Sequence, residues 1–131
     1  MLVNSAGNVG IGTTSPDAKL AVKGQIHANE VKVDLNGAVA PDYVFEKDYK
    51  LSSLEEIKNY IDQNKHLPEV PSAKEMEKNG IQLGEMNMLL LKKIEELTLH
   101  LLNQEKKFTA QEERIKELES VVKEKQVQPH K

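Results

Sequence analysis

The sequence lacks cysteine and tryptophan altogether, and aromatic residues make up only 4% of its 131 residues. Without cysteine the chain can form no disulfide, no thiolate nucleophile and no cysteine-ligated zinc site. A chain this short buries a low fraction of its surface even with a normal composition. With so few large side chains, a monomeric core is hard to assemble, and association of several copies is one remedy.

Strong net charge and long hydrophobic runs are also missing. The 18 basic and 21 acidic residues leave a net charge of −3, which does not indicate binding to nucleic acid or to an anionic membrane. No apolar run approaches the roughly 20 residues of a membrane-spanning helix. The residues after Met1, LVNSAGN, have neither the basic nor the apolar region of a signal peptide. We therefore expect no nucleic-acid partner and no membrane insertion.

The polar residues show no pattern of a catalytic or metal site. The histidines are scattered, without metal-ligand spacing, at His27, His66, His100 and His130. Three acidic residues lie near Tyr43 and Tyr49 in the sequence: Asp42, Glu46 and Asp48. They could hold a cation or act as acid and base, but roles in helix caps and surface charge account for them as well. We interpret His66 as a structural residue whose ring hydrogen-bonds a loop backbone. We expect no enzymatic activity, no metal and no cofactor.

Residues 1–40 predict short β-strands. Apolar residues alternate with polar ones from Leu20 to Ala28, and the alternation continues in the opposite phase at Val31, Val33 and Leu35. Asn36-Gly37 is a strong hairpin-turn signal. Strands this short and this rich in small side chains do not hold a fold alone, so we expect an intertwined trimeric β-structure.

The stretch NVGIGTTSP, residues 8–16, does not match a phosphate-binding loop. Its glycines fit neither G-x-G-x-x-G nor the P-loop, and Ser15-Pro16 stands where a helix would have to begin. Glycines in this setting are typical of tight turns and of close approach of three chains near an axis.

Residues 41–82 predict short helices at a junction region. Ser53 with Glu56 and Ser72 with Glu75 both have capping-box spacing. Pro68 and Pro71 force an extended link between the two helices, and Asn79-Gly80 ends the second one.

Residues 83–125 predict a coiled coil, followed by a disordered tail at 126–131. Heptads are sustained over about five units, and three or four already indicate a coiled coil. The predicted oligomerisation residues are, at a, Asn87, Ile94, Leu101, Phe108, Ile115 and Val122, and at d, Leu83, Leu90, Leu97, Gln104, Gln111 and Leu118. The alternative, an amphipathic helix lying on its own domain, would have to bury a helix of about 60 Å within this small chain.

The flanking charges predict parallel chains. Lys107 and Arg114 at g precede Glu112 and Glu119 at the following e positions, and His100 precedes Glu105 in the same way. The same residues also allow helix pairs such as Glu112 with Lys116. Isoleucine at a with leucine at d favours dimers, whereas glutamine layers beside Phe108 fit a three-fold axis more easily.

Two segments resemble a known family. GNVGIGTTSPDAKLAVKGQI resembles a strand-turn unit of tail-fibre and fibre-like proteins of Bacteroidetes-type phages, and KHLPEVPSA and LGEMNMLLLKKIEELTL resemble their C-terminal module. The resemblance covers residues 8–107 and implies an elongated, parallel homotrimeric fibre tip on a virion or phage-like particle, or otherwise at a cell surface. The layout is also similar to the endosialidase-type intramolecular chaperone, which self-cleaves at a Ser-Asp element. Here that place reads Ala40-Pro41-Asp42-Tyr43, without the serine.

Together these features predict an α+β chain: a β-rich fibre segment, a short-helix junction and a long parallel coiled coil. We expect a structural module that trimerises and caps a fibre. One alternative is an adhesin tip that recognises a host-surface glycan or protein; another is an intramolecular chaperone without self-cleavage.

Overall fold

The computed structural model describes residues 1–35, 37 and 39–127 and has an α+β architecture. Three short strands, β1 (Leu2–Val3), β2 (Val9–Ile11) and β3 (Leu20–Val22), form one sheet. A 3-10 helix, η1 (Pro41–Phe45), precedes the helices α1 (Leu54–Asn64), α2 (Ala73–Asn79) and α3 (Leu83–Val127). Contacts divide the chain into residues 1–34 and 35–131, which we describe separately.

The three strands of the first unit pair with one another in a single sheet. β1 and β2 are antiparallel with Val3 opposite Val9, whereas β2 and β3 are parallel with Val9 opposite Leu20. The connection over residues 12–19 is shorter than the dozen or more residues that parallel neighbours usually need. This part of the chain must therefore turn back tightly.

Glycines permit that tight course. A Cβ atom on Gly10 would lie 2.5 Å from the carbonyl oxygen of Thr13, and one on Gly12 would lie 2.8 Å from that of Lys23. Gly12 also has a φ of +71°, a conformation that side chains disfavour. Both glycines are thus required by close approaches of the chain's own backbone.

The strands predicted after Gly24 do not form. The described residues from Gly24 to Leu35 contain no strand, and Val31 and Val33 are exposed. A strand needs a hydrogen-bonded neighbour, and no described segment of this chain pairs with these residues. Asn36 of the predicted turn lies outside the described residues, as do residues 128–131 of the predicted tail, including His130; Gln126 and Val127 belong to α3.

Both predicted capping boxes are confirmed. Oγ of Ser53 accepts a hydrogen bond from the Glu56 amide at 3.2 Å, and the Glu56 carboxylate accepts one from the Ser53 amide at 2.7 Å. Ser72 and Glu75 repeat the pattern at the start of α2. The second helix ends before Gly80, as predicted.

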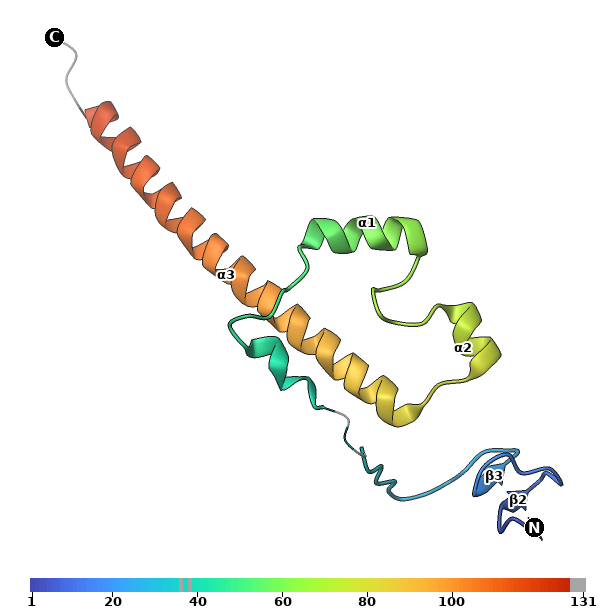
Figure 1. Ribbon diagram of the computed structural model, residues 1–131. Helices are drawn as coiled ribbons and strands as arrows, with labels where there is room; N and C mark the ends of the chain where they lie inside the picture. Colours follow the sequence, from blue (N-terminus) through green and yellow to red (C-terminus); the bar gives the residue numbers. More distant parts are fainter. Residues whose placement is uncertain (36, 38, 128–131) are drawn as a thin grey trace. The chain divides into compact units, whose positions relative to one another are not determined.

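The second unit is organised along α3, which confirms the prediction of one long helix. η1 packs against α3 (Figure 1), and Val44 of η1 is only 1% exposed. Val44 is the one large hydrophobic residue among those described that is fully buried. The chain exposes 11712 Å², whereas a compact monomer of its mass exposes about 6,900 Å². Among the described helices, none is long and apolar enough to cross a membrane.

Candidate functional site

The two faces of α3 differ in what covers them. On one face, the half-buried or buried side chains recur at spacings of three and four residues: Met88, Lys92, Glu95 and Leu99. η1 packs on this side, with Tyr43 stacked under the ammonium group of Lys92 at 5.8 Å. We call this the covered face; it corresponds to heptad positions b, c and f.

The opposite face carries an apolar stripe whose side chains all stay exposed in the single chain. All twelve residues predicted for oligomerisation lie on it and are exposed, with apolar exposures from 46% at Leu90 to 63% at Leu83. We define the apolar stripe by these residues: Leu83, Asn87, Leu90, Ile94, Leu97, Leu101, Gln104, Phe108, Gln111, Ile115, Leu118 and Val122. η1 of the junction region therefore packs against the covered face, whereas the side chains of the stripe stay exposed.

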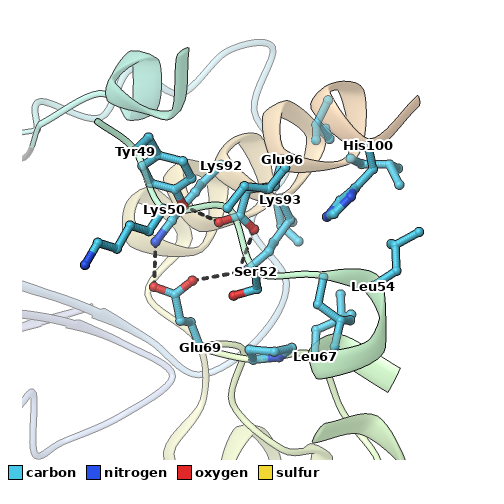
Figure 2. Close-up of a pocket in the computed structure, with 16 residues that line it drawn as sticks. Tyr49, Lys50, Ser52, Leu54, Leu67, Glu69, Lys92, Lys93, Glu96 and His100 are labelled. Carbon is cyan, nitrogen blue, oxygen red and sulfur yellow. Dashed lines mark hydrogen bonds and ion pairs between the residues drawn. The ribbon is translucent and has the colours of Figure 1, made fainter. Parts of the chain in front are cut away.

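A network of polar side chains ties the junction region to α3 (Figure 2). The Tyr49 hydroxyl donates a short hydrogen bond to Glu96, and Lys93 donates to Glu96 at 2.9 Å. Glu69 accepts from Lys92 at 2.5 Å and from Lys93 at 2.6 Å. The loop before α1 and the loop before α2 are thus both anchored to one turn of α3.

This network shifts the pKa values of four of its members, Tyr49, Glu69, Lys92 and Lys93. Burial, together with the hydrogen bond to Glu96, raises the pKa of Tyr49 to about 12. Burial alone would raise the pKa of Glu69, but the hydrogen bonds from Lys92 and Lys93 outweigh it and hold that pKa below 4.5. Burial likewise opposes the charge of Lys92 and Lys93, and Glu69 raises the pKa of both above 10.5. All these groups keep their neutral-pH charge state, so the network is a structural clamp.

A mostly apolar pocket of about 690 Å³ lies beside α3 (Figure 2). We call it the lateral pocket. Its walls come from the segment 49–52, the start of α1, the loop 67–69 and the stretch of α3 from Leu90 to His100. Leu90, Ile94 and Leu97 belong both to this pocket and to the apolar stripe. The pocket is therefore continuous with the stripe.

Two buried polar atoms lack a hydrogen-bond partner among the described residues: Oε2 of Glu95 and Nε2 of His100. Burial, and then repulsion from Asp42, raises the pKa of Glu95 above 4.5. His100 lines the lateral pocket, and its ring projects from α3 toward that pocket (Figure 2). Unpaired buried polar atoms cost free energy, so each needs an explanation.

The remaining polar candidates are a histidine and scattered acidic residues. Nδ1 of His66 lies 3.0 Å from the Leu67 carbonyl oxygen, which confirms its predicted loop role, and its ring packs edge-on against Tyr60. Within the described ranges, no three histidine, aspartate or glutamate residues are grouped closely enough to hold a metal ion.

The clamp and the lateral pocket were missed by sequence reasoning. One signal could have revealed the covered face: Leu89 and Leu99 lie off the heptad stripe, on a side of the helix that is polar beyond residue 102. An apolar outer face over only half of a helix indicates that another segment packs there.

No protein-family model, curated protein or solved structure matches the chain. Its function has to be inferred from its own residues and geometry.

Proposed function

We propose that the chain is a structural module that associates through α3 into a parallel homotrimer and so assembles and caps a phage-like tail fibre. One observation carries the self-association: the apolar stripe stays exposed although the junction region packs on α3. An amphipathic helix that lay on its own domain would bury this stripe. Here the chain buries the other face.

The free energy available from the stripe supports association. Nine large apolar side chains of the stripe are about half exposed, and covering each contributes about 1 kcal/mol. The gross gain is on the order of 10 kcal/mol per chain, or roughly 30 kcal/mol for three chains. Each of the two association steps that form a trimer costs about 4–15 kcal/mol, so the stripe can offset that cost. Beyond residue 102 the rest of the helix surface is almost entirely polar, so the stripe is where copies of this helix would meet.

The orientation of the chains, their number and their biological context are each inferred from a separate observation. Lysine and arginine at g with glutamate at the next e favour parallel chains. Gln104, Phe108 and Gln111 fit three chains around an axis more easily than two. The placement at the end of a tail fibre, in a virion or phage-like particle, comes from the family resemblance alone.

Light scattering on the purified chain tests the association. The expected mass is three times 14.7 kDa, about 44 kDa. Leu101→Asp should reduce the mass to one chain. Leu102→Asp is a matched control, because Leu101 and Leu102 are 59% and 54% exposed but only Leu101 belongs to the stripe.

Equal behaviour of the two variants would contradict the role of the stripe. A native mass of one chain would refute self-association, and a mass of two chains would refute the trimer while leaving the stripe as the interface.

A further inference from the structure

We propose that the lateral pocket is a docking site for the α3 helix of a neighbouring copy of this chain, so that the junction region of one chain grips the helix of the next. This inference rests on the proposed self-association. It adds a second contact surface, contributed by α1 and its flanking loops, that a coiled coil by itself would not have.

The position of the pocket makes a second copy the occupant. Leu90, Ile94 and Leu97 of the apolar stripe line it, so a helix that covers this part of the stripe also contacts the pocket. The g positions Lys93 and His100 line it too. In a parallel assembly the g positions face the e positions of the neighbour.

The apolar walls of the lateral pocket stay partly exposed in a single chain, and a neighbouring helix would bury them. Leu54 and Leu67 are 49% and 43% exposed although they face a common hollow with α3. α1 buries none of its residues fully, and its apolar face is left incomplete within one chain. On the opposite edge of the stripe, Leu91 at an e position is also exposed. The helix of a neighbour would bring its Leu91 and Thr98 toward these walls.

His100 supplies a polar argument for the same partner. Its Nε2 is buried without a hydrogen-bond partner among the described residues. The residue that faces position 100 in a parallel neighbour is Glu105. In such an assembly the carboxylate of the neighbour's Glu105 is placed to accept the hydrogen bond that His100 lacks within one chain.

A tryptophan reporter tests whether the pocket closes on assembly, since the chain has no tryptophan of its own. Leu54→Trp places an indole at the wall of the pocket. In the trimer we expect a blue-shifted emission and at least a threefold lower acrylamide quenching constant than in the same variant combined with Leu101→Asp. Leu101 does not line this pocket, so the second substitution changes only the assembly.

The outcomes separate this inference from the proposed function. A trimer in which the introduced indole is quenched as readily as in the monomer would overturn the docking of the neighbour but keep the stripe interface. Protection of the indole already in the monomer would also overturn it, because the chain's own segments, or a small molecule bound there, would then close the pocket. A wild-type chain that is monomeric on light scattering refutes the proposed function itself.

A second measurement addresses His100. Glu105→Gln should raise the dissociation constant of the assembly roughly tenfold, because a hydrogen bond to a charged acceptor is replaced by one to a neutral amide. Glu113→Gln is the control, since Glu113 lies on the outer face of α3. Equal dissociation constants for the two variants would overturn the pairing of His100 with Glu105.

Discussion

Two neighbouring glutamates of α3, Glu95 and Glu96, meet opposite surroundings. Glu96 accepts hydrogen bonds from Tyr49 and Lys93. Glu95 is only 9% exposed, and its Oε2 has no partner among the described residues. One carboxylate is therefore held by hydrogen bonds and the next has an atom without a partner, although both side chains lie on the covered face.

Replacing Glu95 by glutamine should stabilise the fold at neutral pH. The pKa of Glu95 is raised by burial and by Asp42, so the folded state binds its proton more tightly than the unfolded state. Stability from this residue is then lost as pH rises above 4.5. We expect Glu95→Gln to raise the melting temperature at pH 7 by roughly 3–5 °C, with a smaller difference at pH 4.

Glu96→Gln is the matched control for that substitution. It removes the charged acceptor of Tyr49 and Lys93, so the melting temperature should fall at pH 7. A fall of the same size for Glu95→Gln would show that the Glu95 carboxylate is stabilised by a contact that the described residues do not reveal.

Glu69 should make the clamp sensitive to acid. Its pKa is held below 4.5 by Lys92 and Lys93 against the effect of burial, so its contribution is present above pH 4.5 and is lost as pH falls through the lowered value. At pH 7, Glu69→Gln should cost about 1 kcal/mol of unfolding free energy, since the carboxylate is half exposed and the pairs are partly screened. Urea denaturation at pH 7 and at pH 3 measures this, and the cost should be smaller at pH 3 than at pH 7.

Glu77→Gln serves as the control for Glu69, because Glu77 is an exposed carboxylate of α2 outside the clamp. If both variants lose the same stability at both pH values, the ion pairs with Lys92 and Lys93 do not hold the loop on α3.

At the scale of the elements, short-range sequence patterns predicted where helices begin. Contacts between distant segments could not be predicted from such patterns. The starts of α1 and α2 could be predicted, because a capping box forms within four residues. The two boxes are Ser53 with Glu56 and Ser72 with Glu75. The long helix followed from an unbroken heptad pattern. Residues 24–35 were wrongly predicted as strands, because alternation shows which residues could pair but not whether a neighbour exists.

Sequence patterns were equally limited in predicting the candidate site on the covered face and beside it. The stripe could be predicted residue by residue, whereas η1, the clamp and the lateral pocket depend on contacts between segments 20 or more residues apart, such as Glu69 with Lys93. No short-range pattern encodes such a contact. Only the off-stripe leucines of α3 point toward it.

Gly10 should be the most demanding glycine of the small sheet. A Cβ atom there would clash with the Thr13 carbonyl oxygen at 2.5 Å, and that backbone atom cannot move aside as a flexible side chain would. We expect Gly10→Ala to abolish the β2 to β3 turn, seen as loss of slow amide exchange at Val9 and Lys23. Gly7→Ala is the control: Gly7 has a φ of +73° but open space around its Cβ position, so it should cost only about 1 kcal/mol.

If both glycine variants lose protection from amide exchange to the same extent, then the backbone conformation explains why glycine is needed. The close contact of a Cβ atom with the Thr13 carbonyl oxygen would then not be the reason. Normal protection in Gly10→Ala would contradict the turn geometry itself.

At the scale of the whole molecule, α3 is the element on which the rest of the second unit depends. η1 packs on it, and both junction loops are anchored to Lys92, Lys93 and Glu96. α1 and α2 are too short to be stable helices alone. If copies associate through the stripe, the same helix also raises the effective concentration of the N-terminal segments, which lets weak strands meet.

Deletion of residues 81–131 should therefore also destabilise the structure of the residues that remain. Residues 1–80 lose the surface that buries Val44, the acceptor of Tyr49 and both lysine partners of Glu69. The three strands left behind comprise eight residues and bury almost no large side chain, which is below what an independent sheet needs.

We expect this fragment to be monomeric in sedimentation and to lack a cooperative thermal transition in circular dichroism. The full chain should show both an oligomeric mass and a cooperative transition. A fragment that still sediments as a β-rich trimer would mean that the N-terminal segment drives assembly and that α3 only follows it.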